Sequence, residues 1–289
     1  MRKTVLGSVR LLDALGEIFP DSSRTTLRQM LQSGRVRVNG EIEKNARRQL
    51  ESHDAVDVAP RPAQLALPPE LALLHEDDDV IVVLKAHGLL TVATQREKET
   101  TAQAYLNDYL RSKGGGRIHV VHRLDRETSG VLLFAKSFEA REKLKEKFAE
   151  HDVERVYVAV IEGTMEPPEG TIRSNLLERK DLKMASVGQH RDAKLAVTHY
   201  RTIESKGKYS MLEVTLETGR KNQIRAHLSE AGHAVVGDRL YGSETNPLGR
   251  LGLHAKVLGF AHPATGKRMS FTAPVPRSFR RLFGADPAR

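Results

Sequence analysis

The chain has no cysteine among its 289 residues, and it lacks long apolar runs. The absence of cysteine excludes disulfides and thiolate metal sites and fits a reducing compartment, so we expect a cytoplasmic protein. No segment approaches the roughly 18 apolar residues of a membrane-spanning helix, and the N-terminus lacks the apolar core of a signal peptide. We therefore expect a soluble, monomeric protein without a membrane partner.

Positive charge exceeds negative charge in this sequence. The 46 lysines and arginines and the 37 acids give a formal net charge of +9, which points to a polyanionic partner such as a nucleic acid. Residues 246–289 hold eight basic residues against one acid, whereas a merely solvated surface usually mixes both signs. We predict a basic C-terminal tail that contacts phosphates through Arg250, Lys256, Lys267, Arg268, Arg277, Arg280, Arg281 and Arg289.

Residues 1–59 are predicted to form a small α+β module. Apolar residues at helical spacing predict helices over 9–19 and 24–31. Residues 35–42 alternate and turn at an Asn-Gly pair, which is a strong hairpin signal, and residues 56–58 supply a further strand. Two short helices followed by this hairpin resemble the S4 RNA-binding module.

That resemblance implies RNA contacts by Arg24, Arg28 and Arg35. Arg24 and Arg28 lie one helical turn apart on one polar face. The alternative is that these arginines are ordinary solubilising charges. Residues 60–69 are proline-rich and lack periodicity, so we expect a semi-rigid linker that leads to a second domain over residues 70–289.

The second domain contains nine informative residues at positions 122–130, His-Arg-Leu-Asp-Arg-Glu-Thr-Ser-Gly. Apolar runs of strand type lie on both sides, so the pattern predicts a tight connection between two buried strands. Asp125 stands between Arg123 and Arg126. A turn does not require two arginines, whereas a carboxylate that must stay ionised beside a polyanion benefits from nearby positive charge. Asp125 is therefore a candidate catalytic residue.

These nine residues contain every fixed position of a known signature, His-Arg-Leu-Asp-x-x-Thr-Ser-Gly, and so resemble the RluA-type pseudouridine synthases. A second block, residues 216–241, is similar to the family's Thr-Gly-Arg-x-His-Gln-Ile-Arg block. In that block Asn222 replaces the usual histidine and Ala234 a usual proline, while Ala86 replaces a proline in an earlier block. The resemblance covers most of residues 70–275.

The family resemblance implies a reaction. Uridine in RNA becomes pseudouridine when the N1–C1′ bond breaks, the uracil turns and C5 joins C1′, with no cofactor and no metal. The resemblance assigns catalysis to Asp125, as nucleophile at C1′ or base at C2′, with Tyr157 stacked on the uracil and Arg225 paired with the carboxylate. The RNA contacts that it implies near the site are Arg123, which would assist base flipping, His122 and Arg220.

We expect an α+β fold after the S4-like module, with a largely antiparallel sheet, flanking helices and a cleft across the sheet. Strand segments outnumber helices after residue 70, and no regular βα alternation is present. Residues 137–151 should cover the sheet as a helix through Phe138, Leu144 and Phe148. Residues 163–194, which are rich in turn formers and charge, should include an exposed excursion that faces RNA.

Three alternatives stay open. An S4-like module joined to an RluA-type domain resembles enzymes acting on large-subunit ribosomal RNA, and transfer RNA is the alternative target. A non-catalytic RNA-binding or ribosome-assembly factor would use the module and the basic tail, with Asp125 merely structural. A metal-dependent nuclease would use groups that lack the spacing of a known metal motif, namely His122, His227, His233 and Asp238.

Overall fold

The computed structural model describes residues 2–32, 34–59, 66–95, 97, 99–181 and 183–284. Two compact units are present, Met1–Ala66 with Tyr105–Arg117, and Leu67–Ala104 with Ile118–Arg289. Residues 60–65 of the predicted linker and Arg289 of the predicted tail lie outside the described residues. Among the helices of the described ranges, none has both the length and the apolar character of a membrane span.

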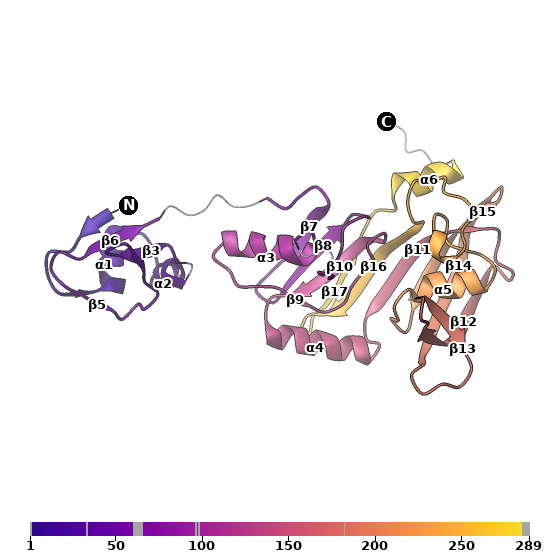
Figure 1. Cartoon of the computed structure of the whole chain (residues 1–289), viewed down its shortest axis with the longest axis horizontal. Coiled ribbons are helices and arrows are strands. Elements are labelled where there is room, and N and C mark those ends of the chain that lie inside the picture. Colours follow the sequence, from indigo (N-terminus) through magenta and orange to yellow (C-terminus); the bar gives the residue numbers. More distant parts are fainter. Residues whose placement is uncertain are drawn as a thin grey trace. The chain divides into compact units, whose positions relative to one another are not determined.

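The first unit is small and mixes helices with short strands (Figure 1). The leucines of its helices pack against valines of strands β3 and β6, which gives this unit its own apolar core. The predicted turn is present, because Asn39 and Gly40 have φ values of 53° and 91°, as a two-residue hairpin turn requires. The elements of the unit are β1 (Arg2–Thr4), β2 (Val9–Arg10), α1 (Leu11–Ile18), α2 (Arg24–Gln32), β3 (Val36–Val38), β4 (Glu41–Ile42), β5 (Gln49–Leu50) and β6 (Ala55–Val58), and helix α3 (Ala102–Ser112) contributes residues to both units.

The second unit is built on an 11-stranded sheet with the order β13-β12-β14-β15-β11-β16-β10-β8-β7, to which β17 and β9 add at β16 and β10. Every pairing is antiparallel except that of β10 with β16, which confirms the predicted α+β fold with a largely antiparallel sheet. The strands are β7 (Leu71–Glu76), β8 (Val80–Lys85), β9 (His119–Val120), β10 (Ser129–Ala135), β11 (Glu154–Glu162), β12 (Glu169–Glu178), β13 (Met184–Val187), β14 (Lys194–Lys206), β15 (Tyr209–Leu216), β16 (Leu253–Ala261) and β17 (Arg268–Thr272).

Helices cover different parts of this sheet (Figure 1). Helix α4 (Phe138–Ala149) packs on β8, β10 and β16 through Ala140 and Leu144. Helix α5 (Gln223–Glu230) packs on β11, β14 and β15 through Ile224 and Leu228. Alternate residues of β11 point to opposite faces, so Ala159 and Ile161 contact the α5 cluster while Val158 and Val160 pack with α6 (Arg277–Phe283).

Strand β16 joins the two halves of the sheet, because it lies between β10 and β11, which do not pair with each other. Gly130 of β10 lies directly against β16. Its φ is +127°, and a Cβ atom there would lie 2.1 Å from the carbonyl oxygen of Ala255. Only glycine fits this close backbone approach, and the approach fixes where the loop before β10 ends.

The prediction that residues 137–151 cover the sheet holds for Leu144 and Phe148 and was wrong for Phe138. Phe138 is 61% exposed, because it begins α4 beyond the sheet, and Arg141 stacks 4.5 Å from its ring centroid. Residues 163–194 include β12, which pairs with β14 along eight residues, and β13, which pairs with β12. Most of the described residues of this segment are exposed or half-buried, as predicted, and their contact with RNA stays a prediction. The polar side chains of β12 suit a strand with both faces partly exposed, which a pattern of turn formers and charge does not reveal.

The basic residues near the C-terminus do not form a tail in the described part of the chain. Three of them are paired within the fold, because Lys256 contacts Glu213 at 3.0 Å, Arg268 contacts Asp152 at 2.7 Å, and Arg250 donates to the carbonyl of Leu253. These three residues therefore lie in β16, β17 and the loop before β16 and not in a tail, and their contact with phosphates stays a prediction.

Candidate active site

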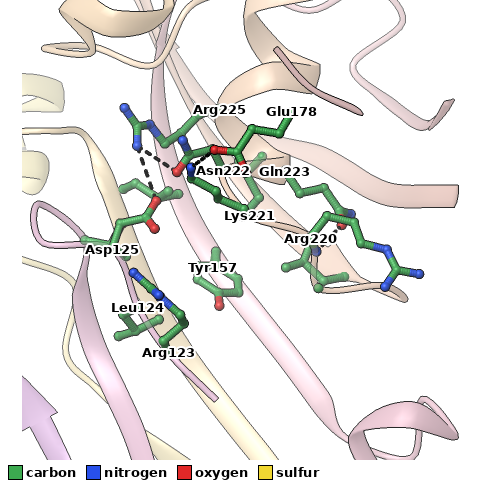
Figure 2. A pocket seen from close by; sticks show the side chains of 15 residues that line it. Arg123, Leu124, Asp125, Tyr157, Glu178, Arg220, Lys221, Asn222, Gln223 and Arg225 are labelled. Atoms are coloured by element: carbon green, nitrogen blue, oxygen red, sulfur yellow. Dashed lines mark hydrogen bonds and ion pairs between the residues drawn. The ribbon is translucent and has the colours of Figure 1, made fainter. Parts of the chain in front are cut away.

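A cavity of about 470 Å³ opens on the second unit where three segments meet (Figure 2). The loop before β10 supplies Asp125, β11 supplies Tyr157, and the first turn of α5 supplies Arg225. The cavity thus contains the three residues that were predicted to be catalytic, which lie up to 100 positions apart in sequence. Other charged residues of the lining are Arg123, Glu178, Arg220 and Lys221.

Asp125 is the acid at the centre of this cavity. Its side chain is 28% exposed, and its Oδ2 accepts a hydrogen bond from Nη1 of Arg225 at 3.3 Å. Arg225 is 13% exposed. Burial lowers the pKa of this arginine, but the attraction of Asp238 and Asp125 outweighs burial and raises the pKa above its ordinary value, so the guanidinium stays charged. Among the described residues, Oδ1 of Asp125 has no hydrogen-bond partner, which leaves it available to a substrate.

The backbone of the loop that carries Asp125 is fixed on both sides. Thr91 Oγ1 accepts from the amide of Leu124 at 3.2 Å and donates to the carbonyl of Leu124 at 2.7 Å. The carbonyl of Arg126 accepts from the amide of Gly88 at 2.8 Å. Since the residues before and after Asp125 are both tied to segment 85–91, the carboxylate is held rigidly, as pre-organised catalysis requires.

Lys85 is a fully buried cation beneath this loop. Its ammonium group donates to the carbonyls of Ala86, Leu89 and Arg126 at 2.9, 2.8 and 3.2 Å. Burial lowers the pKa of Lys85 to about 7, against the attraction of Glu127 and Asp125. The three carbonyl acceptors favour the charged form, so Lys85 ties the loop to the end of β8.

Tyr157 is placed by an irregularity in the sheet. The register of β11 against β16 shifts between Val156 and Tyr157, and such bulges redirect side chains near active sites. Burial raises the pKa of Tyr157 to about 12, with Arg155 opposing and Asp125 adding to the shift. The hydroxyl therefore stays protonated at neutral pH, which suits a ring that stacks on a base better than a general base.

Two segments of the chain match known protein families. The sequence model of the RNA pseudouridylate synthase family matches residues 79–230, and that of the S4 domain matches residues 9–56. The chain belongs to the RNA pseudouridylate synthase family. It is an isomerase with an S4 domain, as the sequence predicted.

Relatives of this synthase match it over nearly its full length. The RNA pseudouridine synthase YlyB of Bacillus subtilis is 36% identical over 95% of this chain and 93% of its own. The ribosomal large subunit pseudouridine synthase D of Neisseria meningitidis serogroup B is 35% identical over 96% of this chain and 78% of its own. The solved structure of human RNA pseudouridylate synthase domain containing 4 aligns with a TM-score of 0.61 at 26% identity, covering 73% of this chain and 92% of that one.

The other predicted RNA contacts of the synthase lie in different surroundings. Arg123 is exposed at the cavity. Arg220 lines the same cavity, and its Nε donates to the carbonyl of Leu195 at 2.9 Å. His122 is half-buried, with its ring stacked 5.0 Å from Phe148 and its Nε2 accepting from the amide of Leu133. Burial, together with Arg155, lowers the pKa of His122 to about 3, so this neutral ring supports the loop from within the protein.

In the S4 unit of the synthase, the predicted arginines differ in their availability. Arg28 is exposed and lines a hollow with Lys44 and Arg47, a grouping that suits phosphate contact. Arg24 is also exposed and forms an ion pair with Asp13 at 3.2 Å. Arg35 is half-buried, and its Nε donates to the carbonyl of Ala59 at 3.0 Å, so part of its hydrogen-bonding capacity serves the fold.

The groups considered for a nuclease metal site are each occupied by protein partners. Asp238 binds Arg225, His227 bonds Ser174 and Thr198, and His233 bonds the carbonyl of Glu162. His122 bonds the backbone of β10. Among the described residues, these four groups do not come together as a cluster that could hold a metal ion.

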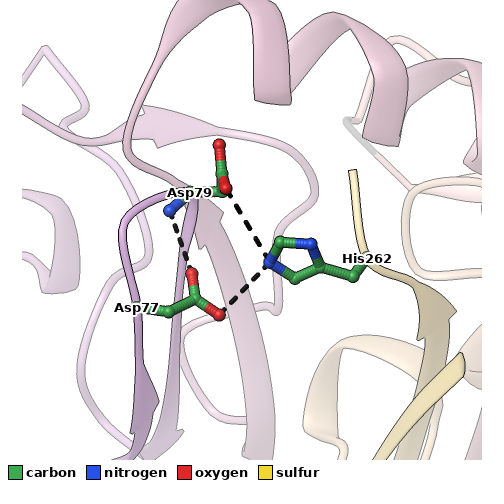
Figure 3. A group of neighbouring side chains, drawn as sticks. All are labelled: Asp77, Asp79 and His262. Atoms are coloured by element: carbon green, nitrogen blue, oxygen red, sulfur yellow. Dashed lines mark hydrogen bonds and ion pairs between the residues drawn. The ribbon is translucent and has the colours of Figure 1, made fainter. Parts of the chain in front are cut away.

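A separate group, Asp77, Asp79 and His262, has ligand atoms within 4.8 Å of one another (Figure 3). Nδ1 of His262 accepts from the amides of Ala264 and Thr265, so the neutral ring carries its proton on Nε2. That nitrogen then donates to Oδ2 of Asp77 at 3.2 Å and offers no lone pair to a cation. The group acts as a hydrogen-bonded clasp between the β7–β8 turn and the end of β16.

Two departures from the family pattern have structural explanations. The amide of Ala86 donates to the carbonyl of Glu70 at 2.8 Å, a bond that a proline could not make. Asn222 adopts a left-handed conformation with φ of 49°, which asparagine tolerates well, and its Oδ1 accepts from Arg225. Ala234 is buried, and its carbonyl accepts from the amide of Glu162.

Sequence reasoning missed the roles of Lys85 and Asp238. Lys85 was assigned no function, and Asp238 was considered only as a metal ligand of the nuclease alternative. An ionisable residue inside a family block is a signal that would have singled them out, although their partners only become visible in three dimensions.

Proposed function

We propose that this synthase isomerises uridines of large-subunit ribosomal RNA, with Asp125 as its catalytic carboxylate. The observation that carries the proposal is the contact of Arg225 with one oxygen of Asp125 inside a cavity whose wall includes Tyr157. A carboxylate held by one oxygen and open at the other can attack C1′ or remove the proton from C2′. Both routes begin at the same atom of the protein.

The remaining groups suit the later parts of the reaction. Once the N1–C1′ bond is broken, the uracil must turn without leaving, and the neutral ring of Tyr157 offers it a stacking surface. Arg123, exposed at the mouth of the cavity, is the cation that would fill the space vacated by the flipped base. Arg220 and Lys221 add positive charge for the flanking phosphates.

The proposed target rests on the relatives and on the S4 domain. Relatives named ribosomal large subunit pseudouridine synthase D match 96% of this chain, including the segment that matches the S4 domain. An accessory module can recognise structured RNA at a distance from the flipped base. We place this module at residues 1–59, the linker at 60–69 and the catalytic domain at 70–289. We also propose that the synthase acts as a monomer.

The test uses RNA that carries tritium at C5 of uridine. Formation of the C5–C1′ bond expels this hydrogen, so tritium in the solvent counts turnovers, and chemical mapping locates the product. We expect release from bare large-subunit RNA without added cofactor and none with Asp125→Asn, whose RNA affinity should stay close to that of the wild type. Normal turnover by Asp125→Asn would refute the assignment, and modification of transfer RNA alone would refute the target.

A further inference from the structure

Arg225 is bound more closely by a second acid than by the proposed catalytic one. Its Nε donates to Oδ2 of Asp238 at 2.6 Å and its Nη2 donates to Oδ1 at 2.8 Å, which is a two-pronged pair of parallel bonds. The side chain of Asp238 is 1% exposed. Asp125 receives a single bond of 3.3 Å from the remaining nitrogen, Nη1. The guanidinium is therefore oriented by Asp238 and only touches Asp125.

Two further residues restrict the guanidinium. Oδ1 of Asn222 accepts from the same Nη1 at 3.0 Å, and Nδ2 of Asn222 donates to the hydroxyl of Tyr241 at 3.3 Å. The Tyr241 ring lies 4.9 Å from the guanidinium carbon, and its hydroxyl also accepts from the amide of Met184. The paired bonds to Asp238, the amide of Asn222 and the ring of Tyr241 hold Arg225 in one orientation. Its guanidinium is directed at Asp125, as Figure 2 shows.

The charges along this line have a chemical consequence. Two carboxylates flank one guanidinium, so Asp238 already balances the charge of Arg225. An arginine with its full charge on Asp125 would favour the ionised carboxylate but would also reduce its tendency to donate electrons to C1′ or C2′. Sharing the charge with a buried acid keeps Arg225 as an orienting donor and leaves Asp125 reactive.

We infer that Asp238 and Asn222 are positioning residues of this synthase, which set the direction and the effective charge of the Arg225 guanidinium at Asp125. The inference rests on the proposed catalytic role of Asp125. Asp238 supplies the negative charge and the two parallel hydrogen bonds, and Asn222 accepts a hydrogen bond that restricts the position of Nη1. Asn222 lines the cavity and Asp238 lies outside its lining, and each accepts hydrogen bonding from Arg225, so we assign both an action through Arg225.

The charge component predicts a shift in the pH profile. Asp238→Asn removes a negative charge behind Arg225, so the site then favours ionised Asp125, and the acid limb of kcat/KM should move to lower pH by about one unit. Asn222→Gly removes no charge and suits the left-handed backbone, so it should leave the acid limb in place. The other ionisable groups that face Asp125 are unchanged in both variants: Lys85, Arg123, Tyr157, Glu178, Arg220, Lys221 and Arg225.

The experiment measures tritium release over a pH series with the full-length synthase at several concentrations of large-subunit RNA, which gives kcat and kcat/KM at each pH. We expect kcat to fall by about 100-fold in Asp238→Asn and about 10-fold in Asn222→Gly, with KM for RNA unchanged, because a small misplacement at the reacting centre acts on the chemical step. Asp152→Asn is the matched control. It breaks an exposed ion pair with Arg268 away from the cavity, and kcat and the acid limb should not change.

The outcomes separate this inference from the proposed function. If Asp125→Asn is inactive while Asp238→Asn keeps the wild-type kcat and acid limb, the inference is wrong and the proposed function stands. A fall in kcat of Asp238→Asn without movement of the acid limb would refute the proposed effect on the charge at Asp125 and would support the proposed orientation of Arg225. If Asp238→Asn fails to fold, Asn222→Gly decides, and an unchanged kcat in that variant overturns the inference. If Asp125→Asn is active, the proposed function itself fails.

Discussion

Gly130→Ala should destabilise the synthase and impair its active site together. A Cβ atom at this position would lie 2.1, 2.6 and 2.7 Å from the carbonyl oxygen, the amide nitrogen and the carbonyl carbon of Ala255. All three are backbone atoms of β16, so a change of rotamer cannot relieve the overlap, and β10 and β16 must separate. Ordinary contact for such a pair begins at 3.4 Å, so the required movement exceeds 1 Å.

The cost of this movement has two parts. Backbone strain at a positive φ contributes about 1–2 kcal/mol, and overpacking contributes about 1–3 kcal/mol. The free energy of unfolding should fall by about 2–5 kcal/mol in total. For a domain of this size, a decrease of about 3 kcal/mol lowers Tm by roughly 6–12 °C. Since Gly130 ends the loop that carries Asp125, kcat should also fall at temperatures where the variant is folded.

Urea and thermal unfolding, followed by circular dichroism, measure the first effect, and tritium release at 20–25 °C measures the second. Gly188→Ala is the matched control, because a Cβ there meets nothing within 4 Å and its φ is not positive. A Gly130→Ala protein that unfolds within about 0.5 kcal/mol of the wild type would show that β10 and β16 yield freely, and would refute the reasoning.

Three further perturbations test other parts of the structure. Lys85→Met should change how the free energy of unfolding depends on pH. The wild-type lysine has a pKa of about 7 in the folded protein and a higher pKa in the unfolded chain, so the unfolded chain binds more protons above pH 7. Between pH 7 and 9 the free energy of unfolding of the wild type should therefore rise by up to about 1.4 kcal/mol per pH unit relative to the variant, and the same pH dependence in both proteins, measured by urea unfolding, would contradict this. Deletion of residues 1–59 should weaken RNA binding and lower the logarithmic salt slope by about 0.7–0.9 for each phosphate that the shortened protein no longer neutralises, whereas an unchanged slope would mean that the module does not touch RNA. Glu178→Gln should tighten RNA binding at low salt, because Glu178 pairs with Lys221 at the cavity and repels phosphate. The control is Glu139→Gln, which removes an exposed acid of α4. Weaker binding by Glu178→Gln would indicate that this carboxylate accepts a hydrogen bond from a base.

The sequence predicted features that depend on local pattern. Helix α2 begins at the predicted Arg24, and the predicted turn is present at Asn39 and Gly40. Asp125, Tyr157 and Arg225 share one cavity, because the family signatures mark the segments that the fold brings together. Residue spacing was therefore sufficient to predict local elements, and the family signatures were sufficient to predict which segments form the site.

Features that depend on distant partners were not predictable. A run of basic residues suggests one surface, but Lys256 and Arg268 lie in adjacent strands, where each meets an acid from elsewhere in the chain. The role of Asp238 depends on the return of the chain after α5 toward Arg225. Phe138 has the expected helical spacing, yet it stands at the helix start, beyond the sheet that the rest of the helix covers.

The position of β16 has a consequence for synthesis of the protein on the ribosome. Strand β10, which follows the Asp125 loop, and strand β11, which carries Tyr157, leave the ribosome before β16, and they can pair with β8 and β15 respectively. They are joined only when residues 253–261 arrive and insert between them. A nascent chain that lacks these residues has no assembled site, so we expect that it cannot modify RNA near the ribosome that makes it until β16 has emerged and inserted.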